Sequence, residues 1–386
     1  MQALHFGSGN IGLGFIGRTL SESGFKVIFS DINQDIVNYI NRHQNYSVIV
    51  AGKNQKQAYN IINISAINAN NSQINKVIAE VDLITTASGP AALELIALTI
   101  ANGIIFKCQI KSVTFLNIIA CENKIKASSY LKNTVLKKLP KQYHDYLKKY
   151  IGFVDCTIDT IIPKKIDFNQ SPLNIIAENF QEWIANPTQF KGNIPKINSL
   201  RLSNNLDSFI ERKLFTLNTG HVIAAYLGLI KKYKTIQQVM SDYKICNIVK
   251  LAMQESGAFL VKHFNFHQKE HDSYINQIFF RFNNPFLSDD LERIGRNPIQ
   301  KLGTQERLIK PFLSCIKHQL PCKNLAIGIA SAFYFFDKND LESVKISYLI
   351  KQKGIETAIS EICDLNDSNA KHLIVSEYQS ILKTIF

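Results

Sequence analysis

Arginine is scarce in this sequence, and charged residues in general are few. Only eight of the 44 basic residues are arginine, and charged residues make up 19% of the 386-residue chain. A disordered chain would carry more charge and fewer apolar residues, whereas 46% of this chain is hydrophobic. The sequence therefore predicts a fully folded protein that is long enough for two hydrophobic cores.

Long apolar runs, paired cysteines and a secretory signal are also lacking. No uninterrupted apolar run reaches the ~18 residues of a membrane span. The chain opens on a strand-like segment, Gln2 to Phe6, rather than on a basic region and an apolar core. The seven cysteines lie far apart and form no CxxC pair. We therefore expect a cytoplasmic protein with reduced, buried thiols and no membrane partner.

The net charge of +13 is compatible with nucleic acid or with an anionic small molecule as a partner. Lysine supplies 36 of the basic residues and is spread along the chain beside abundant Asn and Ile, as an A+T-rich coding bias would give. Nucleic-acid binding instead predicts basic and aromatic residues interleaved on one face. We therefore expect no nucleic-acid partner.

Two halves of the chain have different patterns. Residues 1–195 alternate strand-like and helix-like segments and end in a stretch punctuated by Pro163, Pro172, Pro187 and Pro195, which predicts a parallel sheet with helices on both faces. Residues 196–386 mostly carry apolar residues at three- and four-residue spacing, which predicts helices. The expected fold is an α/β Rossmann-type N-terminal domain followed by a mostly α-helical C-terminal domain. The helices are expected at 206–233, 245–263, 274–282, 304–317, 324–336 and 341–353.

A glycine-rich turn follows the first strand and opens a helix. It reads Gly7-Ser8-Gly9-Asn10-Ile11-Gly12. In such a turn the first glycine permits the tight bend, the second lets the backbone approach a pyrophosphate, and the third lets helix and strand pack closely. The helix N-terminus then attracts the anion. Its position after a strand and before a helix makes this turn a predicted dinucleotide site.

Asp31 ends the second expected strand, about 20 residues after the glycine turn. A carboxylate there can accept hydrogen bonds from the adenosine ribose and would repel the 2′-phosphate of NADP. The alternative is that Asp31 only caps a turn with Asn33. Because the acid and the glycine turn occur together, we expect NAD as the cofactor.

A dehydrogenase also needs a proton acceptor and donors for the developing alkoxide. His263, His267 and His271 recur every four residues, but no acidic or cysteine partner completes a zinc set, and we expect no metal. Lys213, Asn218 and His221 fall within an arc of about 140° if the segment is an α-helix. A lysine held among apolar groups beside a positive nicotinamide should have a lowered pKa and could act as a base. From the residues alone, the favoured interpretation is that these are three ordinary polar side chains on a helix.

The sequence resembles the polyol-specific long-chain dehydrogenases, a metal-independent family that includes mannitol 2-dehydrogenase and the hexuronate reductases. The resemblance rests first on Lys-x4-Asn-x2-His within KLFTLNTGH. It extends over most of the chain, through ALHFGSGNIGLGFIG, NIIACEN, GFVDCTID, TQFKG, ERKLFTLNTGHVIAAYLG, ERIGRNPIQKL and RLIKPFL. These phrases together are far more specific than the glycine turn alone.

The resemblance implies a role for each matching position. Lys213 resembles the general base, Asn218 and Asn123 the amides that stabilise the oxyanion, and His221 the residue that orients the hydroxyl. Thr86 ends the strand expected at residues 81–86 and Gly89 follows it, and both are placed to line the nicotinamide side of the cofactor. Asp159 resembles a substrate-pocket residue, although Thr160 stands where arginine is more usual in the family.

A cluster of arginines lies within residues 281–307. Arg293, Arg296 and Lys301 resemble a substrate-contacting segment of the family, and a guanidinium such as that of Arg296 can bind a phosphate bidentately. The resemblance therefore implies that these three residues bind a substrate phosphate, with Arg307 and Lys310 as outer candidates. A structural ion-pair network is the alternative, and Arg212 and Arg281 are expected to be structural.

The resemblance thus implies NAD-dependent interconversion of D-mannitol 1-phosphate and D-fructose 6-phosphate, in a cleft between the two domains of a monomer or loose dimer. A reductase of a free polyol or a hexuronate is the nearest rival. A nucleotide-sensing or nucleic-acid-binding protein and a degenerate, inactive relative are more distant ones.

Overall fold

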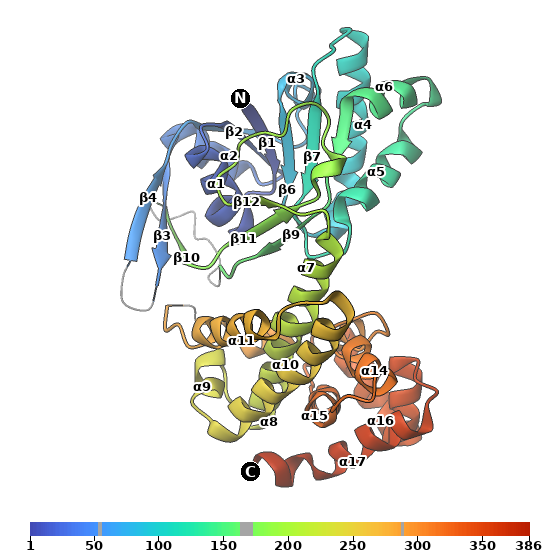
Figure 1. Ribbon diagram of the computed structural model, residues 1–386. Coiled ribbons are helices and arrows are strands. Elements are labelled where there is room, and N and C mark those ends of the chain that lie inside the picture. The colour runs from blue at the N-terminus through green and yellow to red at the C-terminus, as the bar shows by residue number, and fades with distance from the viewer. Residues whose placement is uncertain (53–55, 163–172, 287–288) are drawn as a thin grey trace. The chain divides into compact units, whose positions relative to one another are not determined.

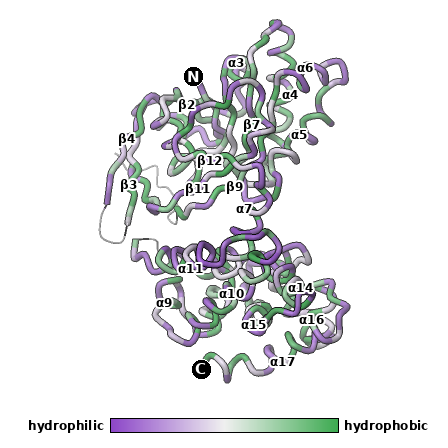
Figure 2. Tube along the Cα trace, viewed as in Figure 1, coloured by the Kyte–Doolittle hydropathy of each residue, from purple (hydrophilic) through white to green (hydrophobic). Residues whose placement is uncertain are grey.

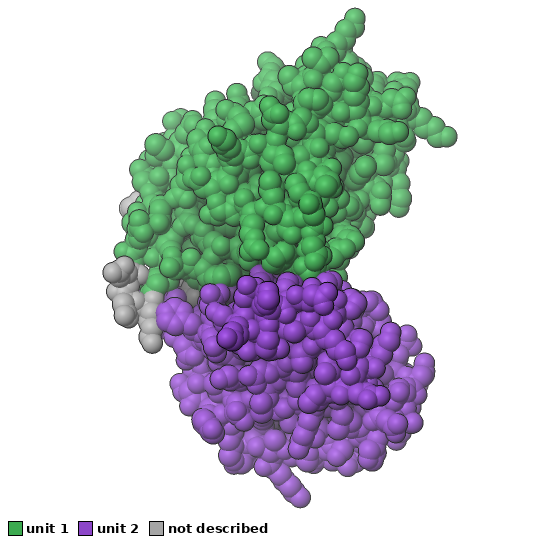
Figure 3. Space-filling model, in the orientation of Figure 1, with its two compact units in different colours: residues 1–209 green, residues 210–386 purple. Residues whose placement is uncertain are grey.

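The computed structural model describes residues 1–52, 56–162, 173–286 and 289–386. The chain forms two compact units, residues 1–209 and residues 210–386, which Figure 3 colours separately and which are described one at a time below. Pro163 and Pro172, two of the prolines that punctuate the sequence, lie outside the described residues.

The first unit is built on a parallel sheet with the strand order β5-β2-β1-β6-β7-β8 (Figure 1). After β1, the chain adds β2 and then β5 on one side, and it then returns to add β6, β7 and β8 on the other side of β1. This reversal beside β1 is the point at which open α/β sheets bind ligands, at the carboxyl ends of the strands. The strands are β1 (Gln2–Phe6), β2 (Lys26–Asp31), β5 (Ile64–Asn68), β6 (Leu83–Thr86), β7 (Leu116–Ala120) and β8 (Ile151–Phe153).

Apolar side chains cover both faces of this sheet, as the near-continuous apolar strands require. Successive residues of β1 belong to different cores: Ala3 packs on one face with Phe15 and Phe29, and Leu4 packs on the other. The helices of the unit are η1 (Gly12–Gly17), α1 (Arg18–Glu22), α2 (Gln34–His43), α3 (Ile74–Glu80), η2 (Pro90–Ala92), α4 (Leu93–Gln109), α5 (Ala127–Lys138), η3 (Lys141–Tyr143), α6 (His144–Tyr150) and η4 (Pro187–Gln189).

Two small sheets add to the core on the Ala3 face. They have the orders β10-β3-β4 and β12-β11-β9, and Tyr46 and Trp183 from them are almost fully buried. The outer strand β4 is largely hydrophilic, as Figure 2 shows, because it lies at the edge of its sheet. The strands are β3 (Tyr46–Ala51), β4 (Lys56–Ile61), β9 (Cys156–Asp159), β10 (Asn174–Glu178), β11 (Glu182–Ala185) and β12 (Leu200–Leu202).

The second unit is helical, and α7 (Leu206–Arg212) leads into it across the division between the units. The prediction of a Rossmann-type domain followed by a helical one is therefore confirmed. Several predicted helices have other bounds. Residues 304–308 form turns, the helix predicted at 274–282 begins at Gln268, and the one predicted at 324–336 ends at Ala332. The helix predicted at 341–353 continues past Lys353 through a kink at Gly354, whose φ is 81°. The helices are η5 (Lys213–Asn218), α8 (Thr219–Ile230), α9 (Ile236–Met240), α10 (Tyr243–Phe264), α11 (Gln268–Phe282), α12 (Leu291–Gly295), α13 (Pro298–Lys301), α14 (Ile309–Lys317), α15 (Lys323–Ala332), α16 (Leu341–Cys363) and α17 (Ser368–Ile385).

One helical stretch of the described chain, Pro90–Gln109, is long and apolar enough to cross a membrane. A core helix of a soluble protein has the same length and composition, so this is weak evidence for a span. Its residues Ile96, Ile100 and Ile104 belong to the core beneath the parallel sheet.

The contact between α3 and α4 depends on Gly103. A Cβ atom added there would lie 2.3 Å from Cγ2 of Ile78, which is fully buried. We predict that Gly103→Ala lowers the free energy of unfolding by about 1–3 kcal/mol, because overpacking outweighs the gain in helix propensity. Urea denaturation measures the change.

The double variant Gly103→Ala/Ile78→Ala is the internal control. It should lose less stability than the sum of the two single variants, since each change relieves the other. Strictly additive losses would show that the two residues do not compete for the same space.

Candidate active site

The glycine turn has the geometry of a pyrophosphate site. Gly7 has a φ of 101°, and a Cβ atom there would lie 2.7 Å from the carbonyl oxygen of Ala87. A Cβ atom on Gly12 would lie 1.9 Å from the carbonyl oxygen of Gly7, whereas Gly9 has no neighbouring atom within 4 Å of its position. The first and third glycines are thus required by packing, and the second leaves open space above the backbone, as the predicted approach of a pyrophosphate requires.

Asp31 is joined directly to the glycine turn. Its Oδ2 accepts a hydrogen bond of 2.8 Å from the backbone N–H of Ser8, and its Oδ1 accepts one of 3.0 Å from the N–H of Asn33. The turn with Asn33 is therefore confirmed, and the same carboxylate is bonded to the glycine turn, whereas its contact with a ribose stays a prediction. A carboxylate has about four acceptor positions, so two remain for ribose hydroxyls.

Asn10 and Ile11 serve the chain itself. The Asn10 amide donates a 2.8 Å hydrogen bond to the carbonyl oxygen of Ile162, and the half-buried side chain of Ile11 packs against the core. Beneath the turn lies His5, which the sequence analysis did not single out. Burial lowers the pKa of His5 to about 3, so a neutral imidazole contacts Thr85 at 2.6 Å between Nδ1 and Oγ1.

A second loop at the same sheet edge is organised by Glu122, which sequence reasoning missed. Its Oε1 accepts hydrogen bonds from the Thr86 hydroxyl (2.8 Å) and the Ser88 N–H (2.9 Å), and its Oε2 accepts one from the Gly89 N–H (2.9 Å). Thr86 is fully buried, and the exposed Asn123 follows Glu122 directly. The parallel register of β6 and β7 thus brings Thr86, Gly89 and Asn123 to one edge of the sheet.

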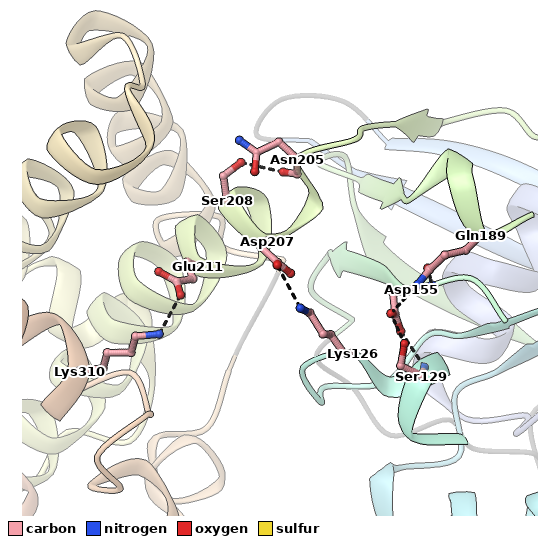
Figure 4. A network of polar contacts seen from close by, with 9 residues as sticks. All are labelled: Lys126, Ser129, Asp155, Gln189, Asn205, Asp207, Ser208, Glu211 and Lys310. Carbon is pink, nitrogen blue, oxygen red and sulfur yellow. Dashed lines mark hydrogen bonds and ion pairs between the residues drawn. The ribbon is translucent and has the colours of Figure 1, made fainter. Parts of the chain in front are cut away.

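Asp159 lies on β9, opposite Glu182 of β11, and is only 2% exposed. Two cavities of about 230 and 210 Å³ open near β8 and α5, and both are lined in part by Ser129 and Gln189. The Asp155 carboxylate joins these two side chains (Figure 4). None of the predicted site residues lines either cavity.

Each end of the helix α7 forms an ion pair, as Figure 4 shows. Asp207 pairs with Lys126 at 3.0 Å within the first unit, and Glu211 pairs with Lys310 at 2.8 Å within the second. Lys310, an outer candidate for phosphate, is therefore already paired with a carboxylate. The helix leads directly to Lys213.

Lys213 and Asn218 are the first and last residues of a π-helical turn, η5. The expectation of regular α-helical spacing is wrong here. In an α-helix residues five apart differ by about 140°, whereas the wider turn made by i→i+5 bonding reduces this angle. His221 follows in the first turn of α8. The structure thus brings Lys213 and Asn218 closer in direction than the sequence pattern indicated.

Hydroxyl groups satisfy the carbonyls of this turn. Ser256 on α10 is fully buried and donates a 2.5 Å hydrogen bond to the carbonyl oxygen of Phe215. The Thr219 hydroxyl lies 3.2 Å from the carbonyl oxygen of Leu214. A Cβ atom on Gly220 would lie 1.8 Å from Cε of Met253, so α10 packs directly against the turn. These contacts show why the wide turn is stable in this place.

His221 lies against a buried carboxylate. Its Nε2 is 3.1 Å from Oδ2 of Asp289, whose side chain is 4% exposed, and the Arg293 guanidinium binds the other oxygen of that carboxylate. Burial works against the charged form, but the contacts with His221 and Arg293 outweigh it and lower the pKa of Asp289. Asp289 therefore fixes both side chains, and no feature of the sequence pattern indicated it.

The predicted phosphate residues differ in their surroundings. Arg293 is engaged by Asp289, and Arg307 pairs with Glu306 at 3.2 Å. Arg296 is exposed, and its carbonyl oxygen accepts a hydrogen bond from the Lys301 ammonium. Burial and then the charge of Arg307 lower the pKa of Lys301 to about 8, against the attraction of nearby carboxylates. Arg293 and Arg296 are thus both exposed, but of these two only Arg293 is paired with a carboxylate of the described residues.

The other expectations concern residues away from this set. Arg212 lies over the Tyr274 ring at 4.4 Å, and Arg281 is 4% exposed. All seven cysteines are free thiols, with Cys121, Cys156, Cys315 and Cys363 buried. Within the described ranges, no group of three His, Cys, Asp or Glu residues could hold a metal ion.

Two family models match nearly the whole chain. The mannitol dehydrogenase Rossmann domain matches residues 1–199, and the mannitol dehydrogenase C-terminal domain matches residues 205–382. The chain therefore belongs to the mannitol dehydrogenase family and is a dehydrogenase, which confirms the resemblance noted in the sequence.

Particular relatives narrow the comparison. Mannitol-1-phosphate 5-dehydrogenase of Buchnera aphidicola subsp. Acyrthosiphon pisum (strain Tuc7) is 61% identical over 386 residues, all of both chains. The enzyme of that name from Buchnera aphidicola subsp. Schizaphis graminum (strain Sg) is 54% identical over 99% of both chains.

Solved structures show the same fold at low identity. A D-sorbitol dehydrogenase in substrate-free form has a TM-score of 0.84 at 13% identity and covers 100% of this chain and 94% of its own. The Pseudomonas fluorescens mannitol 2-dehydrogenase, in a ternary complex with NAD and D-mannitol, has a TM-score of 0.79 at 13% identity, with coverage of 100% and 93%.

The Asp289 contacts give a pH-dependent prediction. At neutral pH, Asp289→Asn should lower the free energy of unfolding by about 1–3 kcal/mol, because charge-assisted contacts in a buried place are lost. Because the folded-state pKa of Asp289 lies below its unfolded value, this stabilisation is complete above the unfolded pKa. It is lost as the pH falls through the folded pKa. Urea denaturation from pH 7 downward should show the gap to the unmodified protein narrowing below about pH 4.

Asp290→Asn is the matched control. Asp290 caps α12 by accepting a 2.8 Å hydrogen bond from the N–H of Arg293, and asparagine caps helices equally well. It should change stability by only a few tenths of a kcal/mol. A gap for Asp289→Asn that stays constant or widens in acid would contradict the assigned contacts.

Proposed function

We propose that this enzyme interconverts D-mannitol 1-phosphate and D-fructose 6-phosphate with NAD and without a metal. The proposal agrees with the name of relatives that are 61% and 54% identical over essentially the full chain. The observation that supports it is the π-turn, which begins at the amine-bearing Lys213 and ends at the amide-bearing Asn218, with His221 in the next turn. Such a set matches the needs of alcohol oxidation, namely a base and oxyanion donors.

Residues 1–195 are proposed to hold NAD. The backbone of Gly7, Ser8, Gly9, Asn10, Ile11 and Gly12 would receive the pyrophosphate, Asp31 the adenosine ribose, and Thr86 and Gly89 the nicotinamide side. Support comes from the open space above Gly9 and from the bond between Asp31 and Ser8. NAD is favoured over NADP because a carboxylate repels a 2′-phosphate. When bound, the cofactor supplies the hydride acceptor for oxidation and the hydride donor for reduction.

Residues 196–386 are proposed to bind substrate and to move the proton. Lys213 takes the hydroxyl proton during oxidation and returns it during reduction. Lys213 is half-buried, and an amine that is partly withdrawn from water is well suited to this role. The amides of Asn218 and of Asn123 donate hydrogen bonds to the developing alkoxide, and His221, held against Asp289, orients the reacting hydroxyl.

Arg296 is proposed as the principal phosphate ligand, since its guanidinium is exposed. Lys301 and Arg293 support it, the latter with those N–H groups that Asp289 leaves available, and Asp159 is proposed to line the substrate pocket. The partner is thus a small phosphorylated polyol or ketose rather than nucleic acid or membrane. We further propose that the enzyme is a cytoplasmic monomer or loose dimer.

The substrate assignment is tested by NADH oxidation at 340 nm. Fructose 6-phosphate, fructose and a hexuronate are compared, before and after EDTA. We expect rapid oxidation with fructose 6-phosphate, unaffected by EDTA, and much slower oxidation with fructose or the hexuronate. Activity only with fructose or the hexuronate would overturn the phosphate site, and no activity with any of them would overturn the proposed function.

The role of Arg296 makes a prediction about KM. Arg296→Ala should raise the KM for fructose 6-phosphate about 10- to 100-fold, because a bidentate charge-assisted contact is lost. The much poorer reaction with free fructose is the control and should not change. An equal loss with both substrates would show that Arg296 supports the fold instead.

The role of Lys213 makes a prediction about kcat. Lys213→Met should lower kcat by about 10²- to 10⁴-fold, the range for loss of a general base, with NADH affinity unchanged. Lys250→Met, on the exposed face of α10, is the matched control and should keep full activity. A kcat within a few-fold of the unmodified enzyme would exclude Lys213 as the base.

A further inference from the structure

Glu122 combines two properties that the proposed mechanism does not use. Its carboxylate accepts three hydrogen bonds, two from backbone N–H groups of Ser88 and Gly89 and one from the Thr86 hydroxyl. All three donors are neutral, and among the described residues Glu122 forms no ion pair with lysine, arginine or histidine. These three hydrogen bonds fix the position of the carboxylate, and no cation among the described residues lies against it to offset its charge.

The position of this charge follows from the strand order. Cys121, the residue before Glu122, continues the pairing of β7 with β6, because its N–H donates a 2.9 Å hydrogen bond to the Thr86 carbonyl oxygen. Asp31 lies at the end of β2, on the other side of β1. In a doubly wound sheet a dinucleotide spans the switch point, with one nucleotide on each side. If the adenosine half lies toward Asp31, the nicotinamide half lies toward Glu122.

We propose that Glu122 is a positioning residue with a redox consequence. It shapes the Thr86–Gly89 segment, and its fixed negative charge beside the nicotinamide favours the oxidised, positively charged ring over the reduced, neutral one. This inference rests on the proposed binding of NAD to the first unit. It goes further because it assigns a residue that sets the relative affinity for the two forms of the cofactor.

The charge and the shape can be separated by substitution. Glu122→Gln keeps the length of the side chain but removes the charge. Glu122→Asp keeps the charge but withdraws it from the three donors. If the charge acts on the nicotinamide, only the first change should alter the ratio of the two dissociation constants. If Glu122 serves only to shape the loop, both changes should weaken both forms of the cofactor alike.

The experiment measures the Kd of NADH by fluorescence titration and the Kd of NAD⁺ by calorimetry or by displacement of NADH. For Glu122→Gln we expect the Kd of NAD⁺ to rise about tenfold and that of NADH to rise about two- to threefold at most. A unit charge several ångströms away in a partly exposed site has an effect of this order. For Glu122→Asp we expect the ratio of the two constants to stay within about twofold of the unmodified value.

Glu255→Gln is the matched control. The Glu255 carboxylate also accepts three hydrogen bonds from neutral donors, Asn324 N–H, Asn324 Nδ2 and Leu325 N–H, but it lies in the second unit. It should leave both dissociation constants unchanged, and thermal unfolding of each variant confirms that it is folded.

The possible failures are distinguishable. If Glu122→Gln raises both constants by the same factor, or changes neither, the charge effect is overturned while the proposed function stands. If the unmodified protein binds neither NAD⁺ nor NADH, the proposed function fails and this inference fails with it. A ratio that shifts equally in Glu122→Asp and Glu122→Gln would also overturn the assignment to charge.

Discussion

The parallel pairing of β1 between β2 and β6 is the constraint on which the first unit depends. Parallel strands end at the same edge of the sheet, so the pairing of the strands is enough to bring residues that are far apart in the sequence together there. The Gly7 turn follows β1, Asp31 ends β2, and Thr86 ends β6. Hydrogen bonds between these loops then complete the edge, because the backbone N–H groups of one loop need acceptors and the carboxylates of another supply them.

Much of this arrangement could be predicted because its signals are local. A glycine turn between a strand and a helix predicts a dinucleotide site, because only glycine fits the backbone of that turn. An acid at the end of the next strand supports the same prediction. The apolar spacing of the C-terminal half likewise indicated helices, because it reflects one buried face of each helix. The Lys213, Asn218 and His221 set needed more than spacing, since polar residues on a helix are common, and resemblance to a family supplied the rest.

The remaining features depend on partners that are distant in sequence. Asp289 meets His221 only because the intervening helices fold back, and nothing around Asp289 distinguishes it from a helix-capping acid. The hydrogen-bond donors to Glu122 lie at the end of β6 and in the loop that follows β6. No sequence pattern distinguishes a glutamate with this role from any other glutamate at the end of a strand. The π-turn is a case in which tertiary contacts override the local period, because its carbonyls are satisfied by Ser256 on another helix.

That π-turn has a consequence for how this segment tolerates insertions and deletions. A π-turn contains one residue more than the α-helical turn it replaces. Removing one residue between Lys213 and Asn218 would let regular α-helical bonding close the gap, because five α-helical residues turn the chain about as far as six residues of the wider turn. The buried face of α8, including Val222 and Ile223, would then keep its place in the core. The packing of α8 therefore tolerates a segment that is one residue shorter, and the extra residue of the π-turn is not needed to hold the helix that follows it.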